Sequence, residues 1–323
     1  MKNILVTGGA GYIGSHITES LLRQDFNVFI VDDLSTGFKK LINKKAKFFK
    51  IDINDYYKIN KIIKKNNIDS IIHLAAKTNI KEAEKKPKIY HRSNVEGTLN
   101  LIKASKYTNV KNFLFSSTCA VYTDKVIRVK ETSKTKPKGI YGLTKLKGEN
   151  LIKKHLKDKK KNYAILRYFN VAGSSPSKRV GQINKADQLF KNLSLAIKKK
   201  KPIFNIYGNN YDTIDGTCIR DFIHVSDLAD IHIKVLIKIN NSNKSTVVNC
   251  GYGKGISVLE IINEFKKFTK NKVKINYKEK RRGDRVEIVA NVNKLREFIK
   301  WKPKFSNLSK MVKSSIEWEK KIT

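Results

Sequence analysis

The glycine-rich run Thr7–His16 constrains the fold of this chain more than any other segment. An apolar strand pattern precedes it and a helical pattern follows it. In such a turn Gly8 or Gly9 permits the tight bend, Gly11 lets backbone amides approach an anion, and Gly14 lets the helix pack closely on the sheet. A strand, a glycine turn and a helix in this order are typical of a Rossmann unit that binds a dinucleotide pyrophosphate.

The second strand pattern indicates which dinucleotide is bound. It covers residues 27–31 and ends at Asp32, which lies 18 residues after Gly14. An acidic side chain at about this spacing reaches the 2′-hydroxyl of the adenosine ribose, and its carboxylate would repel a 2′-phosphate. Asp32 therefore favours NAD, although Lys39 and Lys40, the nearest cations, leave NADP open.

Strand and helix patterns alternate through the first half of the chain. Strands are expected near 47–51, 70–73, 112–116 and 163–168, with helices near 56–65, 87–107 and onward from 141. Alternation of this kind predicts an α/β fold with a doubly wound parallel sheet, helices covering both faces. The pattern weakens after Gly173. We therefore predict a Rossmann domain over 1–174 and a smaller C-terminal α/β lobe over 175–323, with part of 215–240 packing back on the first domain.

Composition excludes some classes of protein. The 323 residues include no apolar run of ~18 or more, so no membrane association is expected. The three cysteines have neither metal-like spacing nor an even number, which indicates no metal site and a cytoplasmic location. The net charge of +40 could suggest nucleic acid, but only 10 of the 68 basic residues are Arg and the Lys are spread along the whole chain. We interpret the charge as a solvated surface rather than a nucleic-acid site.

A Tyr–Lys pair is the best candidate for catalysis. Tyr141 and Lys145 are four residues apart, so on a helix they share one face. A free tyrosine is too weakly ionised to be a base at neutral pH, and a neighbouring ammonium is expected to lower its pKa. The pair follows an apolar strand that ends in the hydroxyl residues Ser116, Ser117 and Thr118, where open α/β sheets bind ligands.

These motifs give the chain a resemblance to a known family. It resembles the extended short-chain dehydrogenase/reductase superfamily and, within it, the UDP-glucose 4-epimerase family. The matching segments are Thr7–His16, His73–Ala76, Asn94–Thr98, Ser116–Tyr122, Arg167–Gly173 and most of Tyr207–Ala229. The likeness therefore spans nearly the whole chain.

The resemblance implies a role for each matching position. Tyr141 would be the acid and base, Lys145 the group that tunes it and binds the nicotinamide ribose, and Thr118 the hydroxyl that orients the sugar. The residues implied for NAD are Gly8, Gly11, Tyr12, Ile13, Gly14, Asp32, Asp33, Asp52, Ile53, Leu74, Ala75, Ala76, Asn94, Ser116, Tyr141, Lys145 and Tyr168. Those implied for the nucleotide sugar are Thr118, Tyr141, Asn170, Gln188, Arg220, Arg281, Asp284 and Ile288.

The implied activity is an NAD-dependent inversion of carbon 4 of a UDP-hexose through a 4-keto intermediate. The alternatives are a UDP-N-acetylglucosamine 4-epimerase, another nucleotide-sugar dehydratase or reductase, and a non-enzymatic protein that binds NAD or nucleic acid. The resemblance also implies a homodimer that pairs through helices near 92–108 and 141–156.

Overall fold

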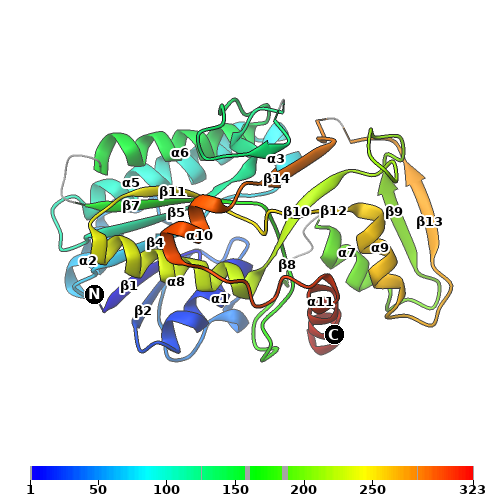
Figure 1. Cartoon of the computed structure of the whole chain (residues 1–323). Coiled ribbons are helices and arrows are strands. Elements are labelled where there is room, and N and C mark those ends of the chain that lie inside the picture. Colours follow the sequence, from blue (N-terminus) through cyan, green and yellow to red (C-terminus); the bar gives the residue numbers. More distant parts are fainter. Residues whose placement is uncertain (1, 125, 157–160, 184–187, 282, 323) are drawn as a thin grey trace.

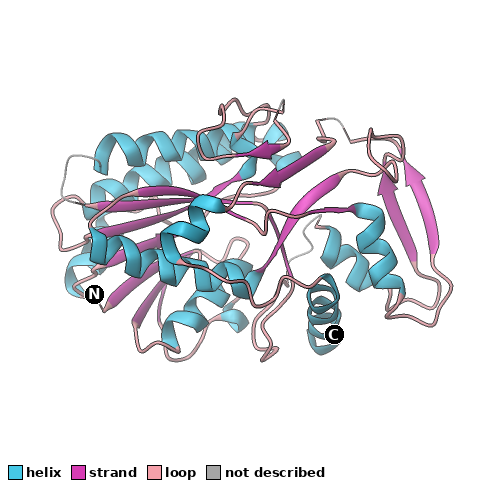
Figure 2. Cartoon of the chain, viewed as in Figure 1, coloured by secondary structure: helices cyan, strands magenta, loops and turns pink. Residues whose placement is uncertain are grey.

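The computed structural model describes residues 2–322 apart from 125, 157–160, 184–187 and 282. Its centre is a seven-stranded parallel sheet (Figures 1 and 2). In spatial order the strands are β11 (Thr246–Cys250), β7 (Asn162–Tyr168), β5 (Asn112–Thr118), β4 (Ser70–His73), β1 (Asn3–Thr7), β2 (Asn27–Asp32) and β3 (Lys47–Lys50). The predicted doubly wound α/β fold is confirmed.

Helices cover both faces of this sheet. On one face lie α1 (Tyr12–Leu22) and α8 (Val225–Ser242), and on the other α2 (Tyr56–Lys65), α5 (Gly97–Ser105) and α6 (Ile140–Leu156). Side chains alternate between the faces of a strand, and in β1 Ile4 and Val6 join the core under α1 while Leu5 joins the core under α2. All three are fully buried, which explains why the strand is apolar throughout.

The helix predicted near 87–107 is composite. It consists of α4 (Pro87–His91), a π-helical turn η2 (Arg92–Glu96) and α5, and α3 (Ile80–Lys85) precedes it. Short 3₁₀ turns, η1 (Lys39–Leu41) and η3 (Cys119–Val121), follow β2 and β5. A π-helical turn within a helix often marks a functional position, and this one carries Asn94.

The second lobe lies at the carboxyl end of the sheet, on the right in Figure 1. Its larger sheet contains β12 (Gly255–Ser257), β10 (Ile219–His224), β14 (Glu287–Ala290), β6 (Arg128–Val129) and β8 (Asn170–Ala172). A smaller sheet pairs β9 (Ile203–Tyr207) with β13 (Lys274–Lys278). The remaining helices are α7 (Leu189–Ala196), α9 (Val258–Lys266), α10 (Asn293–Ile299) and α11 (Leu308–Ile322).

Segments on both sides of the predicted division at residue 174 contribute to the central sheet and its helices. Strand β11 falls in the predicted 175–323 lobe, yet it pairs with β7 at the edge of the central sheet. Helix α8, which overlaps the predicted returning segment 215–240, packs against α1. A parallel strand needs a crossover connection, and α8 supplies it for β11. The chain therefore returns to the first domain after it has entered the second lobe.

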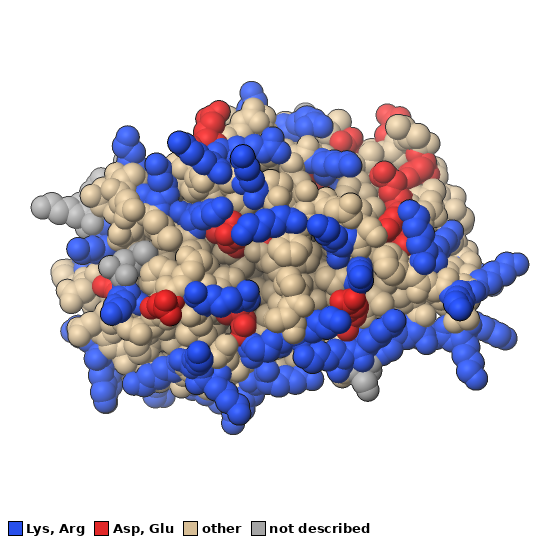
Figure 3. Space-filling model, turned by 60° about the horizontal axis from the view of Figure 1, so that its bottom comes forward, with Lys and Arg blue, Asp and Glu red and all other residues tan. Residues whose placement is uncertain are grey.

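Charge on the surface is widely distributed. Figure 3 shows Lys and Arg side chains scattered over one whole face, with Asp and Glu groups between them. In the described part of the chain, no helix combines the length and apolar character needed to cross a membrane.

Candidate active site

A cavity of about 1920 Å³ lies at the carboxyl ends of β1, β2, β4, β5 and β7, and residues of the second lobe line its other side. Pockets for one small molecule usually measure roughly 300–1,000 Å³. The cavity is therefore large enough for two elongated ligands. It lies at the edge of the sheet where open α/β folds bind their ligands.

The glycine turn forms one end of the cavity. Gly8 has a φ of +73°, and a Cβ atom there would lie 2.7 Å from the backbone nitrogen of Ala75. Gly11 is the N-cap of α1 and provides no capping side chain, and the first turn of α1 contains no acidic residue. The positive end of the helix is thus left open to an anionic ligand.

Asp32 stands beside this turn. Its carboxylate accepts hydrogen bonds from the backbone nitrogens of Ala10, at 3.0 Å, and Leu34, at 2.9 Å. Burial raises the pKa of Asp32, although the two amides work in the opposite direction. The carboxylate therefore fixes the glycine turn and the following loop, and it still lines the cavity, where a ribose diol could donate to it.

All but one of the residues predicted for the cofactor line the cavity. They are Gly8, Gly11, Tyr12, Ile13, Gly14, Asp32, Asp33, Asp52, Ile53, Leu74, Ala75, Ala76, Ser116, Tyr141, Lys145 and Tyr168. The exception is Asn94, which lies behind the wall. Its side chain accepts from the Lys77 nitrogen at 2.8 Å and donates to the Lys77 oxygen at 3.0 Å and to Thr144 at 3.1 Å. Asn94 thus positions the segment after β4, a role that no sequence motif distinguishes from ligand binding.

Thr118, Tyr141 and Lys145 meet in the middle of the cavity. Thr118 ends β5, while Tyr141 and Lys145 lie one turn apart near the start of α6. A side-chain hydrogen bond joins Thr118 and Tyr141. The helix comes this close because Gly142 has no side chain: a Cβ atom there would lie 2.6 Å from the oxygen of Ala120.

Burial controls the charge of both catalytic candidates. It raises the pKa of Tyr141, while the hydrogen bond with Thr118 lowers it. It lowers the pKa of Lys145 to about 7, against a smaller opposite effect of the Glu149 charge. Lys145 donates to the oxygen of Ser116 at 2.8 Å and to its hydroxyl at 3.3 Å. The expected lowering of the Tyr141 pKa by Lys145 is therefore not found in the structure, where desolvation dominates.

Tyr168 lines the cavity, and its hydroxyl contacts a buried histidine. The hydroxyl lies 2.6 Å from Nε2 of His232, whose Nδ1 lies 2.8 Å from the backbone oxygen of Leu228. A carbonyl only accepts, so Nδ1 carries the proton and Nε2 accepts from Tyr168. Burial lowers the pKa of His232 to about 4, so the imidazole is neutral near pH 7.

Three arginines, Arg220, Arg281 and Arg285, line the part of the cavity in the second lobe, and Arg285 is paired with Asp124. Arg220, on β10, lies 3.7 Å from Asp284, and Arg281 lies 3.9 Å above the ring of Tyr207. A guanidinium suits a diphosphate because its planar fork can donate two parallel hydrogen bonds. Asn170, Gln188 and Ile288 line the cavity as well, so every residue predicted for the sugar nucleotide does so.

Sequence reasoning missed several lining residues. Tyr207, at the end of β9, supports Arg281, and the Tyr-Gly-Asn motif that it begins was the available signal. Phe38 and Leu41 lie in the loop after Asp32 and also line the cavity. Nothing in the pattern of that loop distinguishes them from ordinary apolar side chains.

Comparisons with known proteins agree with this geometry. The sequence pattern of the NAD dependent epimerase/dehydratase family matches residues 4–251. A UDP-glucose 4-epimerase of Azospirillum brasilense is 36% identical over 321 residues, which cover 99% of this chain and 92% of that protein.

Solved structures are similar over the whole chain. A UDP-glucose-4-epimerase of Stenotrophomonas maltophila, with bound NAD and formylated UDP-arabinopyranose, superposes with a TM-score of 0.95 at 31% identity, covering 100% of this chain and 99% of that one. The UDP-Glc/GlcNAc 4-epimerase of Campylobacter jejuni is 36% identical with a TM-score of 0.87, covering 99% and 100%.

Proposed function

This chain belongs to the NAD dependent epimerase/dehydratase family, and we propose that it is an NAD-dependent isomerase that inverts carbon 4 of a UDP-hexose. One observation carries the proposal. A single cavity contains an open glycine turn, the Thr118–Tyr141–Lys145 group and the arginines Arg220 and Arg281. These are the parts needed to hold a dinucleotide, move a proton at a sugar hydroxyl and anchor a diphosphate.

The residues present fit NAD. The uncapped start of α1 leaves positive potential for a pyrophosphate, and the Asp32 carboxylate favours a free ribose 2′-hydroxyl. Lys145 lies where it can donate to the nicotinamide ribose. When bound, NAD supplies a cationic ring that takes up and returns a hydride at carbon 4.

The proton steps belong to Tyr141. We assign the proton of the sugar 4-hydroxyl to Tyr141 Oη, which accepts it as a phenolate and donates it back as a phenol. Positive charge in the cavity favours the phenolate, and Lys145 supplies such a charge when it is protonated. Thr118 is hydrogen-bonded to Tyr141, and we assign to its hydroxyl the orientation of the sugar 4-hydroxyl. Arg220 and Arg281 retain the diphosphate while the sugar turns between its two faces.

The residues after Thr118 disfavour a 4,6-dehydratase. Elimination of water across carbons 5 and 6 needs an acid and a base at this point of the sheet. In this chain the two residues after Thr118 are Cys119 and Ala120, and neither has a carboxylate. Burial raises the pKa of the Cys119 thiol, so it stays protonated and is a weak acid. The sugar can then only be reduced again at carbon 4.

The decisive experiment follows the sugar itself. Purified protein is incubated separately with UDP-galactose and UDP-N-acetylgalactosamine, and the products are identified by chromatography. Formation of UDP-glucose from UDP-galactose, with no 4-keto-6-deoxy sugar, is the expected result. Accumulation of a keto sugar would instead indicate a dehydratase, and stoichiometric release of NADH would indicate a dehydrogenase.

A second substrate class is favoured by Ile288. Its side chain lies on β14, 3% exposed, and lines the sugar end of the cavity. By the family resemblance, a large aromatic residue at this position excludes N-acetylated sugars and a smaller residue admits them, and isoleucine is intermediate in size. We therefore propose that the enzyme prefers unmodified UDP-hexoses and also accepts N-acetylated ones.

We also propose a homodimer in the cytoplasm. The predicted pairing segments 92–108 and 141–156 carry two exposed apolar side chains, Tyr107 just after α5 and Leu143 on α6. A four-helix contact between two copies would bury them. Cys119, Cys218 and Cys250 are free, as expected in a reducing compartment. Light scattering of the wild type and of Leu143→Lys tests the pairing, because the variant should be a monomer.

A further inference from the structure

The loop after β2 forms part of the cofactor end of the cavity. Asp33, Gly37, Phe38 and Leu41 of this loop line the cavity. The backbone nitrogen of Phe38 donates to the oxygen of Ala10 at 2.9 Å, which ties the loop to the glycine turn. A ligand held between the glycine turn and Asp32 would therefore contact residues of the loop 33–41, so we expect the position of this loop to affect its release.

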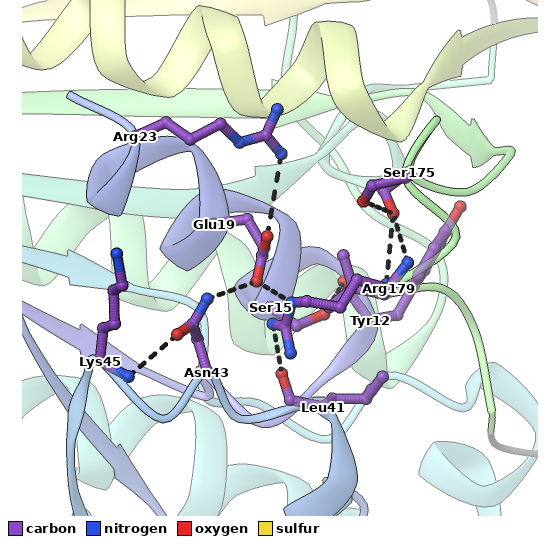
Figure 4. A network of polar contacts seen from close by, with 11 residues as sticks. Tyr12, Ser15, Glu19, Arg23, Leu41, Asn43, Lys45, Ser175 and Arg179 are labelled. Carbon is purple, nitrogen blue, oxygen red and sulfur yellow. Dashed lines mark hydrogen bonds and ion pairs between the residues drawn. The ribbon is translucent and has the colours of Figure 1, made fainter.

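One arginine from the second part of the chain fastens this loop (Figure 4). Arg179 follows β8, and its guanidinium makes an ion pair with Glu19 of α1 and donates to the backbone oxygen of Leu41 at 3.3 Å. Asn43 donates to the same Glu19 carboxylate at 2.8 Å. The carboxylate of Glu19 thus connects α1 with Asn43, just after the loop, and with Arg179, which in turn holds Leu41 at the end of the loop.

An apolar contact beneath the ion pair connects the loop to the C-terminal helix. Leu41, Val180 and Trp318 are buried together, and each comes from a different part of the chain. The indole nitrogen of Trp318, on α11, donates to the oxygen of Gln182 at 2.7 Å. The segment with Arg179 is therefore anchored on the far side and can resist movement of the loop.

We propose that Glu19 and Arg179 form a latch that holds the loop 33–41 closed and slows the release of NAD. The inference rests on the proposed function. Inversion at carbon 4 requires the same cofactor molecule to return the hydride that it took up. If the cofactor dissociated during the cycle, the oxidised sugar could not be reduced again. The Glu19 side chain is 9% exposed and that of Arg179 is 35% exposed, so solvent screens this ion pair in part. Arg179 also donates to the backbone of Leu41, so its loss would remove both an ion pair and a hydrogen bond that hold the loop. Glu19 and Arg179 are positioning residues, since neither lines the cavity.

Cofactor exchange tests the latch directly. Holoenzyme loaded with NAD is mixed with an excess of NAD deuterated on the nicotinamide, and the bound cofactor is followed by mass spectrometry. Arg179→Met is expected to exchange about tenfold faster than the wild type, equal to ~1.4 kcal/mol of lost retention. Arg23→Met is the matched control, because Arg23 contacts the same carboxylate at 3.9 Å but is 62% exposed and touches no part of the loop. It should exchange as slowly as the wild type.

A second variant keeps the test decisive if Arg179→Met does not fold. Glu19→Gln preserves the side-chain shape and removes the charge, and it should also speed exchange. Wild-type exchange rates in the variants that fold would overturn the latch while leaving the proposed function intact. A wild-type protein that takes up no NAD would overturn the proposed function and the latch with it.

Discussion

The buried ion pair behind the catalytic helix gives the sharpest prediction about stability. Glu149, on α6, accepts from Nε and Nη2 of Arg167 at 2.9 and 2.7 Å and from the hydroxyl of Ser117 at 2.5 Å. The side chains of Glu149 and Arg167 are 0% and 3% exposed. Glu149→Gln leaves the buried guanidinium without its counter-charge and turns an amide donor toward it. Breaking a buried pair in this way costs about 3–5 kcal/mol.

That cost can be converted into a melting temperature. At about 2.1 cal/mol/K per residue, the entropy of unfolding of a chain of this length is about 0.7 kcal/mol/K, so Glu149→Gln should melt about 4–7 °C below the wild type. Lys153→Gln is the control, because its ammonium lies 3.6 Å from the same carboxylate but is 38% exposed. An exposed pair contributes about 0–1 kcal/mol, so this variant should melt less than about 2 °C lower. Equal melting temperatures for the two variants, measured by calorimetry, would refute the reasoning.

Three further predictions concern the cavity. Tyr141→Phe should keep the fold and the bound NAD but lower kcat about 100- to 10,000-fold, because it removes only the proton-transfer group; near-normal turnover would exclude Tyr141 as the base. Burial lowers the pKa of Lys145 to about 7 from 10.5, so between these values the unfolded chain binds more protons and stability gains from rising pH. The free energy of unfolding, measured by urea denaturation, should therefore increase between about pH 6.5 and about pH 9.5, and this increase should be smaller in Lys145→Met than in the wild type. Lys147→Met, which changes an exposed lysine of α6, is the control and should show the wild-type increase. Ile288→Tyr should reduce activity on UDP-N-acetylgalactosamine relative to UDP-galactose, and an unchanged ratio of kcat/KM values would contradict the pocket assignment.

Local patterns predicted the parts of the site that depend on local geometry. The glycine spacing placed Gly8 and Gly11 between β1 and α1, and the four-residue spacing placed Tyr141 and Lys145 on one face of α6. Such relations depend on a few consecutive residues and on fixed helical or strand periods. They are therefore visible in the sequence before any tertiary contact is known.

The electrostatics of the same residues could not be predicted in this way. The rule that an ammonium lowers a neighbouring tyrosine pKa ignores how deeply both groups are buried. In the structure Lys145 is 3% exposed and makes its hydrogen bonds with Ser116, so desolvation determines its pKa and that of Tyr141. The role of Asn94 could not be predicted from its motif either. The motif does not indicate that the side chain lies outside the cavity lining, nor that its amide donates to Lys77 and Thr144.

The interleaved chain limits how far the two parts of the molecule can move apart. The chain passes between the two parts of the molecule after β7, again from β10 into α8, and again after β11. Several connections, together with the β10–β8 pairing and the contact of α8 with α1, resist hinge opening at any single linker. The catalytic side chains are then held at fixed positions relative to Arg220 and Arg281, which is the pre-organisation that proton transfer requires. We therefore expect the ligand, rather than the two lobes, to move during the reaction. The loop that we propose to control cofactor release, residues 33–41, is the segment that Arg179 holds from the other side of the predicted domain boundary.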